Sequence, residues 1–252
     1  MSGDSLGDRM KRYEDVSRHS LMRRTPVIIR IDGKAFHTFT KCLPLYDESM
    51  KVGPYSEKMY TVMAATSRVL FDKIQNAQFV YSQSDEISIL LKDWDTHETQ
   101  QWFDGNLQKL TSVSSSIATA AFNFLFSTIR EPNWVGDLAY FDARAFNVPE
   151  SEVVNYFIWR QQDASRNSIQ MFGRHYFSHK QMHGRNVSQI QDMLMAEHQF
   201  NWNDAPTWMK RGFAVYRNPN SFDSSSPSVV DSEIPLFTQD REFISKYLEI
   251  EE

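Results

Sequence analysis

The stretch that decides the fold of this chain reads Val27-Ile-Ile-Arg-Ile-Asp32-Gly33-Lys-Ala-Phe36-His37. Its β-branched run is typical of a buried strand, and the strand stops at Gly33. A second run of this kind reads Phe79-Val-Tyr-Ser-Gln-Ser84-Asp85-Glu86-Ile-Ser-Ile-Leu-Leu91. It predicts a hairpin with strands at 79–82 and 87–91. Both runs therefore carry carboxylates where a strand ends.

Carboxylates on rigid strand ends are costly to bury unless a cation neutralises them. Hard oxygen ligands that converge in this way suit Mg²⁺, which keeps waters and substrate phosphates as its other ligands. Asp32, Asp85 and Glu86 are therefore the candidate catalytic acids. Either stretch alone is equally consistent with a turn-capping aspartate or with hairpin-tip charges that face solvent. The two together favour metal-dependent phosphoryl transfer.

The elements around these strands predict a ferredoxin-like α+β fold. Helical patterns cover 8–22, 47–74 and 100–129, and period-two alternation predicts a further strand at 141–146. The resulting order β-α-β-β-α-β is the split arrangement that polymerase and cyclase palms share. In that arrangement the first strand lies beside the hairpin, so Asp32 and Asp85 can meet at one edge. Additional C-terminal elements are expected, namely helices at 150–177, 186–197 and 238–248 and a strand at 208–216.

Length and composition predict a single globular catalytic unit of residues 1–217. Residues 218–252 are expected to form a Ser/Pro-rich linker, to residue 230, and then a C-terminal helical arm. The single cysteine, Cys42, excludes an intrachain disulfide framework. No apolar run is long enough for a membrane span or a signal peptide, which predicts a cytoplasmic protein without membrane contact.

Charge is unevenly distributed along the chain. The net charge of −5 argues at first against a nucleic-acid partner. However, residues 1–41 carry nine Lys and Arg against five acids, and residues 160–185 carry five against Asp163 alone. A phosphate-binding face on an acidic protein is therefore possible, although solvated helix faces explain the same counts.

Two further patterns are candidates for ligand contact. Gly33 permits a close backbone approach, and the amides that follow it, from Lys34 to His37, can point at phosphates if the chain turns there. In the helix predicted at 150–177, Arg160 and Asn167 fall on one polar stripe, which either faces substrate or is a solvated face.

A histidine pair follows that helix. His179 and His183 have a spacing that can chelate zinc, but the sequence offers no obvious third ligand. Contact of His179, Lys180 and His183 with phosphate or RNA is the better interpretation.

Four motifs in combination resemble the tRNA-histidine guanylyltransferase family. They are Arg30-Ile-Asp32-Gly33-Lys-Ala-Phe36-His37-x-Phe39, Tyr81-x-Gln83-Ser84-Asp85-Glu86-Ile, Phe141-Asp-Ala-Arg144 and Trp159-Arg160-Gln161-x-Asp163. Members of the family add nucleotides to the 5′ end of tRNA, in the 3′-to-5′ direction. The resemblance implies a polymerase-like palm, two Mg²⁺ ions, GTP, ATP and other nucleoside triphosphates as substrates, tRNA as a partner, and a tetramer built as a dimer of dimers.

The same motifs imply a role for individual residues. Asp32 and Asp85 would hold both metals, with the Gly33 carbonyl as a further ligand and Glu86 as the neighbouring acid. The nucleotide triphosphate would be bound by Asp32, Gly33, Lys34, Ala35, Phe36, His37, Ser84 and Asp85. Contacts to RNA or a second nucleotide are expected from Lys109, Arg160, Asn167, His179, Lys180 and His183.

Two departures from the family pattern narrow the expectation. Guanylyltransferases proper carry His-Ile-Asn-Asn-Leu-Tyr-Asn after the Arg-Gln-x-Asp element, whereas this chain has Ser165-Arg-Asn-Ser-Ile-Gln170-Met. That difference resembles the Thg-like branch of bacteria, archaea and phages, which repairs 5′-truncated tRNA against a template. The segment Leu43-Pro44-Leu45-Tyr46-Asp47 also lacks the basic residue usual there, for which Lys41 is the nearest substitute.

Three alternatives remain beside templated repair. A dedicated tRNA-histidine guanylyltransferase shares most of the motifs. A nucleotide cyclase shares the palm, but Ser84-Asp85-Glu86 lacks the Gly-Gly that precedes the acidic pair in such cyclases. A catalytically silent RNA-binding protein is disfavoured by the three intact acids, because a binder has no need to gather carboxylates near phosphate.

Overall fold

The computed structural model describes residues 5–41, 53–94, 96–130, 136–217 and 228–248. Its centre is a six-stranded sheet in the order β4-β1-β3-β2-β5-β6, in which all neighbours are antiparallel. The first four strands have the order of a ferredoxin-like palm, which confirms the predicted fold class. The strands are β1 (Val27–Gly33), β2 (Ala77–Gln83), β3 (Glu86–Leu91), β4 (Phe141–Asn147), β5 (Phe213–Arg217) and β6 (Ser228–Asp231).

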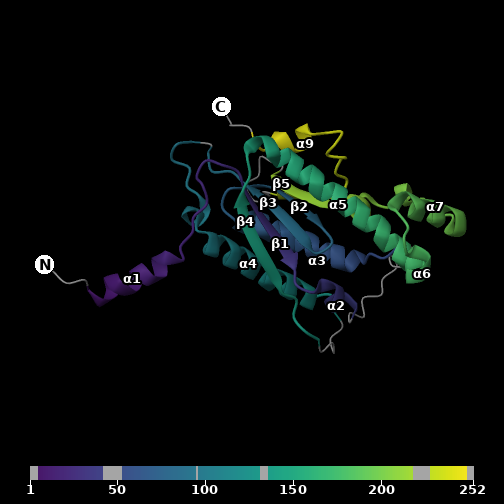
Figure 1. The fold of residues 1–252 in the computed structure, drawn as a ribbon, viewed down its shortest axis with the longest axis horizontal. Coiled ribbons are helices and arrows are strands. Elements are labelled where there is room, and N and C mark those ends of the chain that lie inside the picture. The colour runs from purple at the N-terminus through teal and green to yellow at the C-terminus, as the bar shows by residue number, and fades with distance from the viewer. Residues whose placement is uncertain (1–4, 42–52, 95, 131–135, 218–227, 249–252) are drawn as a thin grey trace.

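Helices cover both faces of the sheet (Figure 1). On one face, α3 (Glu57–Lys73) and α4 (Leu107–Ser127) pack on Ile29 and Ile31 of β1. On the other face, the 27-residue helix α5 (Glu150–Tyr176) packs on Ile28 and Leu90. The alternation of apolar residues along β1 therefore serves two cores at once.

The remaining helices lie around this body. A third apolar cluster joins the C-terminal half of α5 to α7 and α8. By contrast, α1 buries none of its residues and extends away from the sheet (Figure 1). Among the helices that the structure describes, none combines the length and the apolar run that crossing a bilayer would take. Besides α3, α4 and α5, the helical elements are α1 (Leu6–Val16), α2 (Phe36–Lys41), η2 (Trp102–Gly105), α6 (His179–Met182), α7 (Val187–His198), η3 (Trp202–Asp204), α8 (Thr207–Arg211) and α9 (Glu242–Ser245).

Several predicted boundaries were wrong. Helix α3 begins at Glu57 and not at residue 47, because Ser56 caps it by accepting from the Met59 amide. Helix α4 begins at Leu107 and not at residue 100, because Asn106 caps it and because Phe103 and Asp104, just before it, have left-handed backbone angles. The helix predicted at 8–22 ends already at Val16. Of the helix predicted at 238–248, only α9, Glu242–Ser245, is helical.

The C-terminal region also differs from the prediction. The strand expected at 208–216 begins only at Phe213, since α8 occupies residues 207–211 and Gly212, at a φ of 80°, turns the chain. The last three residues of the expected linker, 228–230, belong to β6, which pairs with β5. Ile234 and Phe237 are buried in the α5-side core, so this region packs on the sheet. Residues 218–227, and the Pro44 segment discussed above, lie outside the described residues.

Gly33 is required where β1 turns into α2. A Cβ built on Gly33 would lie 2.2 Å from Cδ2 of Phe36. Phe36 is itself buried, with its ring centroid 5.2 Å from that of Phe122 and 5.0 Å from that of Phe141. Because the ring is packed on several sides, it has little room to move away from a new methyl group.

We therefore predict that Gly33→Ala destabilises the fold by about 1–3 kcal/mol, through overpacking against Phe36. Thermal unfolding followed by circular dichroism measures the change. The matched control is Gly7→Ala in α1, where a Cβ meets only the Ser5 hydroxyl oxygen, at 3.7 Å. An unchanged melting temperature for Gly33→Ala would contradict the overpacking argument.

Candidate active site

The β1 and β3 strands bring the two acidic stretches together. Their antiparallel register pairs Asp32 with Glu86, and the Gly33 amide donates to the Asp85 carbonyl oxygen at 3.1 Å. The hairpin turn that carries Asp85 is therefore tied directly to the end of β1. The two stretches, 53 residues apart in the chain, form one edge of the sheet, as their place in the palm predicts.

Asp85 experiences an unfavourable electrostatic environment. Burial first, and then the negative charge of Asp32, raise the pKa of the Asp85 carboxyl group to about 6, although the Ser84 hydroxyl partly offsets this. Two carboxylates that repel one another in a half-buried place are the arrangement that a bound cation stabilises. Within the described ranges, neither Asp32 nor Asp85 forms an ion pair, in contrast to Glu86.

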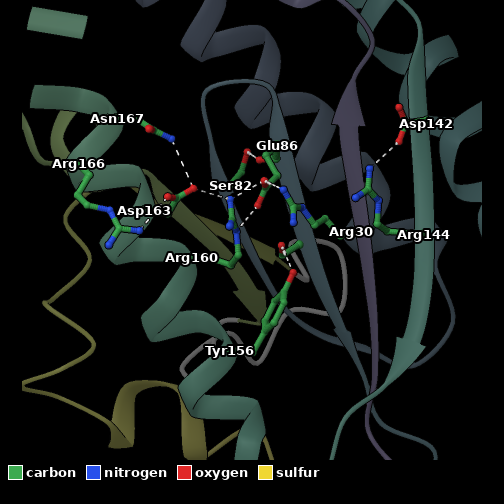
Figure 2. Close-up of polar contacts among 11 residues, drawn as sticks. Arg30, Ser82, Glu86, Asp142, Arg144, Tyr156, Arg160, Asp163, Arg166 and Asn167 are labelled. Carbon is green, nitrogen blue, oxygen red and sulfur yellow. Dashed lines mark hydrogen bonds and ion pairs between the residues drawn. The ribbon is translucent and has the colours of Figure 1, made fainter. Parts of the chain in front are cut away.

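Glu86 lies in a different environment from Asp85, and Figure 2 shows its contacts with Arg160 and Arg30. Its side chain is buried and its Oε1 and Oε2 accept from Nε and NH2 of Arg160, both at 2.7 Å. Arg30 of β1 contributes a second ion pair, at 2.6 Å to Oε2. The predicted neighbouring acid is therefore engaged by two guanidinium groups within the protein.

Arg160 is also held from its other side. Asp163 accepts from NH2 of Arg160 at 3.2 Å and from Arg166 at 3.0 Å. Burial alone would lower the pKa of Arg160, but the hydrogen bonds and charge of Glu86 outweigh it and the pKa is raised. Arg160 is therefore a charged group in the interior, bound by the carboxylates of Glu86 and Asp163.

A cavity of about 560 Å³ opens beside Asp85. Of the predicted nucleotide-binding residues, Phe36, His37, Ser84 and Asp85 line it. Its other walls come from distant segments and were not predicted as site residues: Tyr55, Tyr60, Met171, Arg174, His175 and Trp208. The volume lies within the range of small-molecule sites, which are mostly apolar with a few polar groups.

The aromatic wall of this cavity is well ordered by packing. The rings of Tyr60 and Trp208 stack with their centroids 4.5 Å apart, and Phe213 meets Tyr60 edge-on at 5.3 Å. At the α5 end, Arg174 and His175 are exposed side chains that border the same space. The cavity thus has the Asp85 carboxylate at one end, the Arg174 guanidinium group at another and flat aromatic rings between them.

The amides after Asp32 are only partly available to a ligand. The Gly33 amide binds Asp85, and the Lys34 amide donates to the Tyr140 carbonyl oxygen at 2.8 Å. The first-turn amides of α2, at Phe36 and His37, are those that helix geometry leaves unbonded. Ala35, at a φ of 54°, makes the turn between strand and helix.

The residues predicted to contact RNA are scattered. Asn167 is exposed on α5, and His179, Lys180 and His183 are exposed on or next to α6, beyond the cavity wall. Lys109 is exposed near the start of α4, beside Phe103, and so lies toward the opposite end of β1 from Asp32. Arg160 differs from these exposed residues, because only 4% of its side chain is accessible to solvent.

The residues present fit a magnesium ion better than a closed metal site. In the described part of the chain no three His, Cys, Asp or Glu side chains gather as a ligand set, and this includes His179 and His183. Asp32, Asp85 and the Gly33 carbonyl offer oxygen atoms only. That donor set suits an ion which takes its remaining ligands from water and phosphate.

Comparison with known proteins gives consistent results. The profile of the tRNAHis guanylyltransferase family matches residues 7–149. The chain is similar to a bacterial tRNA(His) guanylyltransferase-like protein solved in complex with ATP, with 44% identity, a TM-score of 0.88, and coverage of 98% of this chain and 100% of the other. A second such structure, in complex with GTP, has 42% identity and a TM-score of 0.79 over 97% of this chain and 99% of the other. The tRNA(His) guanylyltransferase of Schizosaccharomyces pombe is 28% identical over 83% of this chain and 79% of its own length.

The raised pKa of Asp85 predicts a pH-dependent stability. Since the folded-state pKa is about 6 and the ordinary value is 3.8, the folded protein binds a proton more tightly than the unfolded chain. Stability should therefore fall as pH rises from about 4 to 6, and the cost remains at higher pH. Without metal, Asp85→Asn should be more stable than the wild type at pH 8 by about 1–3 kcal/mol.

Thermal unfolding of both proteins in EDTA, at pH 4.5 and pH 8, measures this difference. The advantage of Asp85→Asn should shrink at the lower pH. An advantage of equal size at both values would mean that the carboxyl group does not titrate in this range.

Proposed function

Because the chain belongs to the tRNAHis guanylyltransferase family of nucleotidyltransferases, we propose that it adds nucleotides to the 5′ end of tRNA in the 3′-to-5′ direction. The observation that carries this proposal is the cavity beside Asp85, whose acidic end lies where β1 and β3 meet. The acids, the cavity and the cationic far wall suit a nucleoside triphosphate. Templated repair of 5′-truncated tRNA is the physiological role we favour.

The reaction is a phosphoryl transfer. The 3′-hydroxyl of the incoming nucleotide attacks the α-phosphorus of a 5′-triphosphate on the RNA, and pyrophosphate leaves as the new phosphodiester bond forms. An RNA that ends in a 5′-monophosphate is first activated: its phosphate oxygen attacks the α-phosphorus of ATP or GTP, pyrophosphate leaves, and AMP or GMP is joined to the RNA end. When the 3′-hydroxyl of the incoming nucleotide then attacks the RNA phosphorus, that AMP or GMP is the leaving group. In each step an attacking phosphate or hydroxyl oxygen replaces a phosphoanhydride oxygen at phosphorus, so the protein needs to position groups and balance charge.

Individual residues contribute to this positioning. Asp32 and Asp85, with the Gly33 carbonyl, would hold two Mg²⁺ ions, which when bound activate the attacking hydroxyl and offset charge on the leaving pyrophosphate. Phe36, His37 and Ser84 line the cavity. In our proposal the phosphates of the nucleotide lie beside Ser84 and the backbone amides of Phe36 and His37.

Other side chains serve the base and the RNA. The stacked rings of Tyr60 and Trp208 form a flat wall against which a base can pack. Arg174, His175 and the exposed residues of α6 extend a cationic surface from the cavity along the path of RNA.

The proposed assembly and substrates follow from the family. ATP and GTP are bound in two structures of bacterial tRNA(His) guanylyltransferase-like protein to which this chain is 44% and 42% identical. We extend nucleotide binding to this chain on that basis, together with the cavity volume. The tetramer implied by the resemblance remains a prediction.

Removal of either metal-binding acid tests the reaction. We predict that Asp32→Ala and Asp85→Ala each abolish Mg²⁺-dependent nucleotide addition to a 5′-truncated tRNA. The fold should be retained, because the two carboxylates repel one another in the metal-free protein and the loss of one removes that repulsion. Labelled product on a denaturing gel, with circular dichroism of each variant, provides the measurement. Asp192→Ala, which removes an exposed carboxylate from α7, is the control. Turnover like that of the wild type in either variant would overturn the assignment.

Template dependence tests the favoured branch. The segment from Ser165 to Gln170 lacks the residues by which a dedicated guanylyltransferase commits to one untemplated G. Base pairing must then supply selectivity, because a paired nucleotide aligns its 3′-hydroxyl, and misalignment by an ångström costs on the order of a hundredfold in rate.

The comparison uses truncated tRNAs that differ only in the templating base. We predict efficient addition of the nucleotide that pairs with each template and slow addition of the others. If G is added at equal rates opposite every base, the chain is a dedicated tRNA-histidine guanylyltransferase, which is the alternative that shares its motifs.

A further inference from the structure

The turn that presents Asp85 is conformationally strained. Gln83 and Glu86 are the last register pair of β2 and β3, so Ser84 and Asp85 form a two-residue turn. Ser84 has a φ of 52°, in the left-handed region that favours glycine. This region is unfavourable for a residue with a Cβ, and such strain persists only where the surrounding structure fixes the flanking residues.

The residue that follows the turn is fixed from three directions. The Ser82 hydroxyl donates to the Glu86 carbonyl oxygen at 2.9 Å, which holds the backbone. Arg160 binds both carboxylate oxygens of the Glu86 side chain, and Arg30 binds one of them. Figure 2 shows Arg160 reaching from α5 to Glu86 at the end of β3, with Arg30 on the side of β1.

Arg160 cannot serve as a free substrate contact in this arrangement. Its side chain is 4% exposed, and Glu86 and Asp163 bind the guanidinium group. A bidentate guanidinium–carboxylate pair fixes the orientation of both groups, which a single ammonium contact does not. The pair therefore restrains where the strained turn can sit.

We propose that Arg160 is a positioning residue, which holds the β2–β3 turn so that Asp85 is presented to the cation. The proposal rests on the proposed function only in taking Asp85 to be a metal-binding acid. Loss of the pair leaves Glu86 without its main restraint, and the turn relaxes toward conformations without a left-handed Ser84. Arg160 and Glu86 then act as one unit, and removal of either partner has the same consequence at Asp85.

The test compares variants of the two partners. Arg160→Met and Glu86→Gln each remove the charge pair, and the double variant removes both groups. Arg160→Lys keeps the charge but loses the bidentate geometry, so it reports even if Arg160→Met fails to fold. The matched control is Arg166→Met, at the outer end of the same network, where the arginine is 56% exposed and bound to Asp163.

The first readout is binding of Mn²⁺ in the presence of a non-hydrolysable nucleoside triphosphate. Binding is monitored through the electron paramagnetic resonance signal of the ion. We expect Arg160→Met and Glu86→Gln each to weaken Mn²⁺ binding by about tenfold or more, in keeping with the cost of misplaced groups. The double variant should be no weaker than either single variant, and Arg160→Lys should lie between them and the wild type. Arg166→Met should bind Mn²⁺ as the wild type does.

The second readout needs neither metal nor turnover. In the Arg160 variants, hydrogen exchange should accelerate relative to the wild type, and the acceleration should be larger in the peptide that contains Ser84 and Asp85 than in the rest of the sheet. A lower melting temperature with unchanged Mn²⁺ affinity and uniform exchange would overturn the proposal, because Arg160 would then stabilise the fold alone. Additive losses in the double variant would also overturn it.

Failure of the proposed function has a different signature. In that case the wild type adds no nucleotide to truncated tRNA, while Mn²⁺ binding and local exchange still distinguish the variants. If the wild type binds no Mn²⁺, the exchange readout decides whether Arg160 holds the turn. Arg160 as an RNA contact would instead weaken RNA binding and leave the Mn²⁺ titration unchanged.

Discussion

The antiparallel register between β1 and β3 is the constraint on which this structure depends. It places Asp32 opposite Glu86 and brings the Gly33 amide to the Asp85 carbonyl oxygen. Because side chains alternate between the faces of a strand, a slip of one residue would move every side chain of β1 to the other core. Arg30 would then lie among the apolar residues of the α3 and α4 side. The register is thus specified by burial on both faces at once.

Two acids that are neighbours in the chain have opposite electrostatic environments. Glu86, the first residue of β3, faces α5 and is neutralised by Arg30 and Arg160. Asp85, one residue earlier, lines the cavity and has its pKa raised to about 6 by burial and by Asp32. Two adjacent carboxylates thus differ in environment, because internal arginines compensate the charge of Glu86 while burial and a second carboxylate disfavour the charged form of Asp85.

The cavity depends on packing between segments that lie far apart in the chain. Tyr60 of α3 stacks on Trp208 of α8, while Met171 and Arg174 come from the C-terminal half of α5. The same helix carries Arg160 three to four turns earlier, where it is tied to the sheet. The α5 helix therefore connects the acidic turn to the far wall of the cavity. This is a physical reason for the length of α5, and for the third apolar cluster that fixes its end.

The sequence by itself determined the ferredoxin-like order of strands and the place where Asp32 and Asp85 meet. These follow from local patterns, since strand alternation and the βαββαβ order leave few ways to pair the strands. The motifs also predicted the family. Only the tertiary structure decided that Glu86 and Arg160, 74 residues apart, form a buried pair, and that Tyr60, Trp208 and Arg174 border one cavity. Such partners are chosen by how helices dock on a sheet, and the local sequence pattern of neither partner contains that information. For the same reason, polar spacing on α5 did not separate the buried Arg160 from the exposed Asn167.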